Sequence, residues 1–144
     1  MITAKKDILK AMYNSLDWFD ITFSEIAISA GSALLMHGLR EYTSDVDLIA
    51  NEYTYQKLLD AGLTPCPIRK TLIDVTPMVS VQIETEFDVN TTLIDGVIVL
   101  DCKSLLAQKK NLLKKFDRSH DKLNADAIDL VNLTLNIAKM EKEP

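Results

Sequence analysis

The pattern of hydrophobic positions predicts a helix first, then a strand, a turn and a second, shorter helix. Apolar residues recur every three or four positions over residues 4–19, which is the spacing of one helix face. Residues 25–30 form a short apolar run that ends at Gly31 and Ser32, and residues 33–37 contain no β-branched residue. We therefore expect a strand over 25–30, a tight turn at 31–32 and a short helix over 33–37.

The middle of the chain changes from helical to β-type patterns. Residues 45–50 alternate polar and apolar before becoming fully apolar, which predicts a strand whose far end is buried. A helix is expected over residues 53–61, where a glycine follows the last periodic position. Strands are expected over residues 70–76 and 79–89, joined by a turn at 76–78. The second of these strands alternates apolar with mainly acidic residues, so one of its faces is apolar and the other is acidic.

The last third of the chain predicts one more strand and two closing helices. Residues 94–100, interrupted by an Asp-Gly pair, favour a strand, and residues 103–116 and 124–142 have helical periodicity. A length of 144 residues without repeat or linker fits one domain, 1–144, with the C-terminal helices starting at about 103. The expected fold class is α/β (α+β), with a small mixed sheet flanked by helices.

Composition excludes several classes of protein. The chain is 47% hydrophobic and 26% charged, which is typical of a folded globular protein and excludes a disordered or low-complexity one. Two cysteines without CxxC spacing and two histidines do not supply a disulfide framework or a four-ligand zinc site, so any chemistry rests on carboxylates. The charged N-terminus does not look like a signal peptide, and no run is long enough to span a membrane. We expect a cytoplasmic protein without a membrane partner.

Charge is distributed unevenly along the chain. Residues 103–122 carry seven basic and two acidic side chains, which is an excess of five positive charges. Since the net charge of the whole chain is −5, the other residues together carry a charge of −10. Such a segment can contact a polyanion locally, although a lysine-rich run is more often one solvated helix face.

Two aspartates at the start of the strand over 45–50 are the main candidates for chemistry. Asp45 and Asp47 are two positions apart, so their side chains leave the same face of a strand with Cα atoms about 7 Å apart. Carboxylate and phosphate oxygens are the ligands that Mg²⁺ prefers, so this pair predicts a site for Mg²⁺ or Mn²⁺. The pair alone is weak evidence, because the chain contains four acid-x-acid pairs, close to the number expected by chance.

Gly31 and Ser32 add to this signal. They lie where a strand is expected to meet a helix, and backbone N–H groups at such a junction attract phosphate. Taken alone, the two residues are better explained as a plain turn and helix cap.

The complete run GSALLMHGLREYTSDVDLIA, residues 31–50, resembles the signature of the nucleotidyltransferase superfamily with the polymerase β-like fold. It is most similar to the AbiEii-type toxin nucleotidyltransferases, whereas antitoxin-type members and aminoglycoside nucleotidyltransferases have differently spaced signatures. The matching positions are Gly31, Ser32, His37, Gly38, Leu39, Arg40, Thr43, Asp45, Asp47 and Leu48.

The resemblance implies a minimal nucleotidyltransferase fold and a catalytic site with three carboxylates. The implied activity is Mg²⁺-dependent transfer of a nucleoside monophosphate from an NTP to an acceptor hydroxyl, with Asp45 and Asp47 as metal ligands. The family pattern takes a third carboxylate from the next long strand. Asp88 is the expected residue, and Glu86 and Glu84 on the same face are alternatives.

The resemblance also implies nucleotide-binding residues, which are Gly31, Ser32, Arg40, Thr43 and Lys109, with Lys110 as an adjacent alternative to Lys109. Arg118, Asp126 and Asp129 are rough counterparts of later family positions. Ala125, however, stands where family members have a lysine.

Two functional hypotheses follow for this sequence. In the first, the protein is a nucleotidyltransferase whose acceptor is an RNA or tRNA end, with a protein hydroxyl or a small antibiotic as alternatives. In the second, it is a catalytically inactive module of the same fold, related to toxin-antitoxin or phage-defence systems, that binds a partner protein or a nucleotide.

Overall fold

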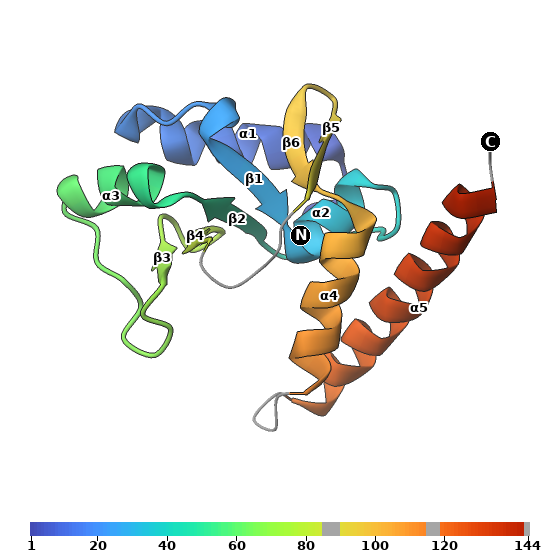
Figure 1. Ribbon diagram of the computed structural model, residues 1–144. Coiled ribbons are helices and arrows are strands. Elements are labelled where there is room, and N and C mark those ends of the chain that lie inside the picture. The colour runs from blue at the N-terminus through green and yellow to red at the C-terminus, as the bar shows by residue number, and fades with distance from the viewer. Residues whose placement is uncertain (85–89, 115–118, 143–144) are drawn as a thin grey trace.

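The computed structural model describes residues 1–84, 90–114 and 119–142. Helices and strands alternate through the first half of the chain, and two long helices close it (Figure 1). The helices are α1 (Lys5–Leu16), α2 (Ala30–Met36), α3 (Glu52–Asp60), α4 (Cys102–Leu113) and α5 (His120–Lys142), with short 3-10 turns η1 (Asp17–Phe19) and η2 (Phe23–Glu25). The strands are β1 (Ile26–Ser29), β2 (Val46–Ala50), β3 (Leu72–Asp74), β4 (Val79–Ile83), β5 (Thr91–Ile94) and β6 (Val97–Leu100).

The described strands form one mixed sheet in the order β3-β4-β2-β1-β6-β5. At its centre, β1 is antiparallel to β2 and parallel to β6, and β2 is parallel to β4. Helices flank this sheet, so the predicted α+β fold with a small mixed sheet is confirmed. None of the described helices combines the length and the apolarity that crossing a bilayer requires.

Alternation along the central strands separates a buried apolar face from a polar one. Ile28, Leu48 and Val81 are almost completely buried on one face, and they belong to the same core cluster as side chains of α1 and α2. Their neighbours Asp47 and Ser80 stand on the opposite face, because successive residues of a strand point to opposite sides. The predicted alternation is therefore observed at the centre of the sheet.

The junction between β1 and α2 is tighter than expected. A turn was predicted at 31–32, but α2 begins at Ala30, directly after the last residue of β1. Ala30 makes the change of direction alone, with φ of +52°, a left-handed conformation that is uncommon outside glycine. Its backbone N–H donates to the side-chain Oε1 of Gln108 in α4 at 3.3 Å. The prediction of a separate turn was wrong because one strained residue, held by a distant helix, replaces it.

The strand predicted over 94–100 is a hairpin. β5 and β6 pair antiparallel on either side of Asp95 and Gly96, which have φ of +51° and +81°. Two positive φ values in a two-residue loop are typical of a type I′ turn, for which Asp-Gly is a preferred sequence. The prediction of a single strand was therefore wrong, and the Asp-Gly pair that seemed to interrupt it is the hairpin turn.

Candidate active site

One row of polar side chains crosses the sheet on its polar face. Asp47 of β2 lies opposite Ser29 of β1 on one side and Ser80 of β4 on the other, and Ser80 in turn lies opposite Asp74 of β3. Paired residues of adjacent strands point to the same face. Asp45 lies immediately before β2 and is exposed. The structure thus places both predicted aspartates at the start of β2, beside the C-terminal end of β1.

The Asp47 carboxylate is held in an environment that disfavours its charge. Burial is the main cause that raises its pKa, and the negative charge of Asp45 raises the pKa further. A hydrogen bond from Ser80 Oγ to Asp47 Oδ1, at 3.0 Å, acts in the opposite direction, as do the positive charges of Arg69 and Lys109. A divalent cation beside the two carboxylates would relieve their repulsion, and their oxygen donors suit Mg²⁺.

Ser32 connects α2 to the strand that carries Asp47. Its side chain is completely buried, and its hydroxyl donates to Ser29 O at 2.8 Å. The same oxygen accepts a hydrogen bond from Asp47 N at 3.1 Å. The hydroxyl is thus used within the protein and fixes the backbone of Asp47, while a contact between Ser32 and a phosphate stays a prediction.

Thr43 positions the other aspartate. The Thr43 hydroxyl donates to Asp45 O at 2.9 Å, and the backbone of Thr43 pairs with Ile2. This buried threonine therefore ties the loop before β2 both to the acid pair and to the N-terminal segment.

Arg40 lies directly against Gly31 at the start of α2. A Cβ atom at Gly31 would collide with the end of the Arg40 guanidinium group, so glycine at this position leaves the space that the guanidinium fills. Arg40 Nη2 is also 3.5 Å from Asp129 Oδ2 of α5. Two of the predicted nucleotide-binding residues are therefore neighbours in space, next to the acid pair.

We expect Gly31→Ala to destabilise the protein by about 1 kcal/mol, the low end of the cost of overpacking, because the added Cβ displaces the end of a flexible arginine side chain that contacts Asp129. In an Arg40→Ala background the same change should be neutral, or should stabilise by up to about 1 kcal/mol, because alanine restricts the unfolded chain more than glycine does. The free energies of urea unfolding of the four proteins measure this coupling. Equal effects of Gly31→Ala in both backgrounds would contradict the contact.

Lys109 lies in a buried cluster of charges. Its Nζ is 3.0 Å from Asp126 Oδ1 and 3.1 Å from Asp129 Oδ2, and all three residues are buried. Since Arg40 also contacts Asp129, this cluster joins α4, α5 and the loop before β2. The charge of Lys109 lowers the pKa of Asp47, but the described contacts of Lys109 are with α5.

The expected third carboxylate has three candidates, Asp88, Glu86 and Glu84. Asp88 and Glu86 lie outside the described residues. Glu84 comes four positions after Ser80, roughly 13 Å further along the strand direction, and so does not lie beside Asp47. Over residues 1–84, 90–114 and 119–142, no group of three histidine, cysteine or acidic side chains is arranged to hold a metal ion.

Three residues of the polar row, Ser29, Ser80 and Asp74, were not predicted as site residues. Asp74 stands two strands from Asp47, roughly 10 Å away, on the same face of the sheet. A sequence pattern does not contain the register between strands that are distant in the chain, so only the alternation over 79–83 indicated which face Ser80 occupies.

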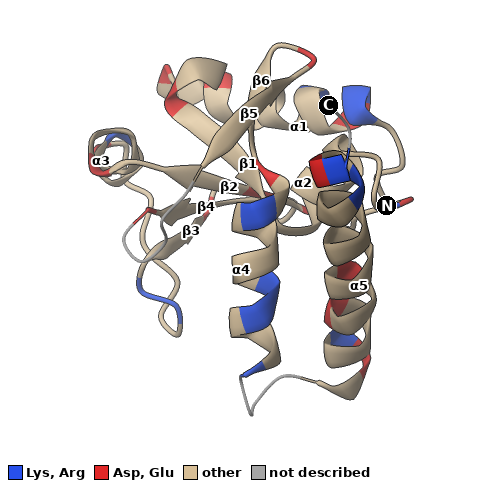
Figure 2. Ribbon diagram, turned by 45° about the vertical axis from the view of Figure 1, so that its right-hand side comes forward, with Lys and Arg blue, Asp and Glu red and all other residues tan. Residues whose placement is uncertain are grey.

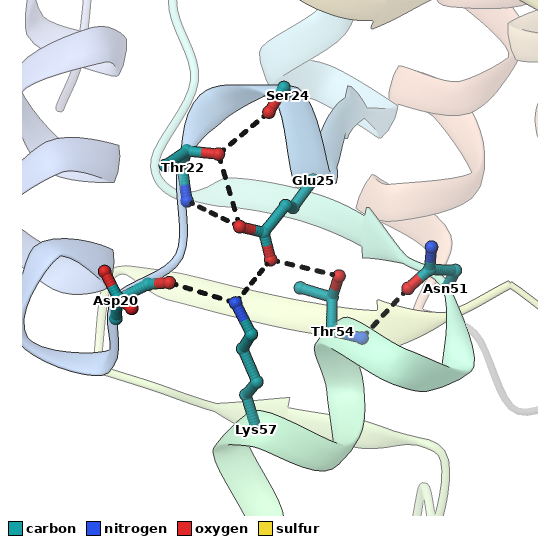
Figure 3. Close-up of polar contacts among 7 residues, drawn as sticks. All are labelled: Asp20, Thr22, Ser24, Glu25, Asn51, Thr54 and Lys57. Carbon is teal, nitrogen blue, oxygen red and sulfur yellow. Dashed lines mark hydrogen bonds and ion pairs between the residues drawn. The ribbon is translucent and has the colours of Figure 1, made fainter.

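A second polar cluster lies where η2 meets α3 (Figure 3). Glu25 Oε2 is 2.9 Å from Lys57 Nζ, and Lys57 also donates to Asp20 O at 3.1 Å. The hydrogen bond and charge of Lys57 lower the pKa of Glu25. Asn51 caps α3 by accepting from Thr54 N at 2.9 Å. These groups satisfy one another, which is typical of a structural cluster that orients a helix.

Comparison with known proteins adds little to this geometry. No protein-family model and no curated protein matches the sequence. Among solved structures, the chain is similar to an antigenic nucleotidyltransferase-like protein from Paracoccidioides brasiliensis, with a TM-score of 0.49 and 16% sequence identity. The similarity covers 90% of this chain and 74% of that one. At such values it does not establish a shared function.

Proposed function

We propose that the protein transfers a nucleoside monophosphate from an NTP to an acceptor hydroxyl with Mg²⁺ or Mn²⁺. One observation carries the proposal: Asp47 is held at the start of β2 with a raised pKa, next to Asp45 and hydrogen-bonded to Ser80. Such an arrangement costs folding free energy, so it is more typical of a functional site than of a structural one.

Each residue near the acid pair has a role in this proposal. Asp45 and Asp47 hold the cation, which when bound would activate the attacking hydroxyl and stabilise the leaving pyrophosphate. The backbone around Gly31 and the guanidinium of Arg40 would contact the triphosphate. Asp88 would supply the third carboxylate, in keeping with the family resemblance.

The favoured acceptor is an RNA or tRNA end. Lys103 and Lys110 are exposed on α4 and Lys114 is exposed directly after it, and Figure 2 shows basic positions along this helix. The same helix carries Gln108, which contacts Ala30 beside the polar row. Exposed lysines on a helix that also contacts the backbone beside the polar row support a polyanionic acceptor, because lysines bind phosphate backbones irrespective of sequence.

The direct test is incubation with each α-³²P-labelled NTP, Mg²⁺ and total tRNA. We expect label on RNA with the wild type and not with Asp47→Ala. Asp7→Asn is the matched control, because Asp7 is an exposed acid on α1 and should leave transfer unchanged. Label on the protein itself would show that the acceptor is a protein hydroxyl and that the reaction is still nucleotidyl transfer. No label with any NTP would contradict the proposal.

The alternative function is an inactive module of the same fold that binds a nucleotide or a partner protein. It is favoured by the described part of β4, where the residues on the same face as Asp47 are Ser80 and Gln82 rather than acids. Calorimetry separates the two functions: Mg²⁺-dependent NTP binding without label transfer would support the inactive module.

A further inference from the structure

The outward side of α5 is apolar. Ile128, Val131 and Leu135 are 62%, 56% and 64% exposed, and the exposed residues Asn124 and Ala138 continue their line at either end. We call these five residues the α5 stripe. From residue 123 to 138 the helix contains two charged residues, both acidic and both buried on the inward side. A contiguous exposed apolar helix face of this kind is normally covered by a partner.

The spacing of the α5 stripe is that of a helix-pairing seam. Its positions are separated alternately by four and three residues, as in the core of a two-stranded coiled coil. The neighbouring side chains Ala127 and Thr134 are small and uncharged, so a second helix can approach closely. The 23 residues of α5 extend for about 34 Å at 1.5 Å per residue.

The surroundings of α5 leave room for such a helix. α5 forms one edge of the molecule, with α4 along its inner side (Figure 1). Ile128 and Leu135 also line an open groove of about 690 Å³ between α5 and residues 38–42, where the exposed Tyr42 forms part of the opposite wall.

The charges at the two ends of α5 indicate which helix fits. Asp121 and Lys122 are both exposed at the start of the helix, and Asp121, seven positions before Ile128, is the one on the side of the stripe. Lys139 and Lys142 are exposed at its end. The acid near the end, Glu141, is 3.8 Å from Lys103 of α4. Two copies of α5 in antiparallel orientation would place Asp121 of each near the lysines of the other, whereas parallel copies would place like charges together.

We propose that the chain forms a symmetric dimer in which the α5 stripes of two copies pack antiparallel, with the two-fold axis near Val131, the middle of the stripe. A two-fold axis brings identical surfaces together, so a self-complementary seam is sufficient to make the interface. The proposal does not depend on the proposed enzymatic function.

Light scattering coupled to gel filtration tests the dimer. At micromolar concentration we expect the wild type to have twice the chain mass of 16.1 kDa, and Val131→Lys/Leu135→Lys to have the single-chain mass. Ile68→Lys is the matched control, because Ile68 is 92% exposed outside the stripe and should leave the dimer intact. Circular dichroism verifies that each variant is folded. A monomeric wild type would overturn the proposal and would indicate that a different protein covers the α5 stripe.

Engineered cysteines test the orientation. In a Cys66→Ser background, Val131→Cys lies near the two-fold axis and should form a disulfide-linked dimer on oxidation. Asn124→Cys lies at the end of the stripe and should not, because antiparallel copies hold the two positions far apart. Cross-linking at both positions would indicate parallel helices, and cross-linking at neither would indicate a different interface. Either result would contradict the proposed arrangement.

Discussion

Asp47→Asn is expected to reduce Mg²⁺-dependent nucleotidyl transfer by at least about 100-fold, because a metal ion contributes several kcal/mol of charge stabilisation and each 1.36 kcal/mol is a factor of ten. Asparagine keeps the shape of the side chain and an oxygen that accepts the Ser80 hydrogen bond, so the loss isolates the negative charge. Initial rates of label transfer at saturating NTP measure the effect. If the variant kept more than a tenth of the wild-type rate, Asp47 would not be a ligand of the catalytic metal ion.

The same variant is expected to be more stable than the wild type at neutral pH. The pKa of Asp47 is raised in the folded protein, chiefly by burial and then by Asp45, so its ionised form opposes folding. The favourable contribution of protonated Asp47 to the free energy of unfolding is complete at pH values below the ordinary pKa of an aspartate. It is lost as the pH rises through the raised pKa. Asparagine avoids this loss, so its advantage in free energy of unfolding should grow over that pH range.

Urea unfolding of both proteins from acidic to neutral pH, without divalent cations, measures this difference. Asp7→Asn, which changes an exposed acid on α1 outside the polar row, serves again as the control. A variant that is less stable than the wild type over the whole range would show that the Asp47 carboxylate supports the fold rather than straining it.

Lys109→Met is expected to lower the free energy of unfolding by about 3–5 kcal/mol, the usual cost of removing one partner from a buried ion pair. Methionine fills a similar volume, so the loss comes from charge rather than from a cavity. Asp126 and Asp129 would remain buried without the ammonium group that now lies 3.0 and 3.1 Å away. Chemical denaturation of the purified variant measures the change.

A rescue variant distinguishes charge from packing. Lys109→Met/Asp126→Asn/Asp129→Asn should recover part of the lost stability, because neutral amides tolerate burial better than carboxylates that have lost the Lys109 ammonium group. If the triple variant were no more stable than Lys109→Met, the cluster would contribute through shape or through other contacts. Label transfer measured on the same proteins would show whether Lys109 also has a role beyond the fold.

Local patterns were sufficient to predict most of the elements. Alternation of apolar and polar residues predicted β2 and β4, and helical spacing predicted α1, α3 and α4, since these periods follow directly from backbone geometry. The predictions were wrong where residues with left-handed backbone conformation change the direction of the chain. These residues are Ala30, and Asp95 with Gly96. An Asp-Gly pair can interrupt a strand or join two, and only the partner strand decides which.

The sequence by itself determined most of the element types, the sheet class and the position of Asp45 and Asp47 at the start of one strand, because all of these depend on neighbours close in the chain. The tertiary structure alone decided that Ser80 donates to Asp47, that Arg40 fills the space above Gly31 and that Lys109 joins two acids of α5. Those contacts depend on strand register and helix packing between segments up to 33 positions apart. No local period encodes such distances.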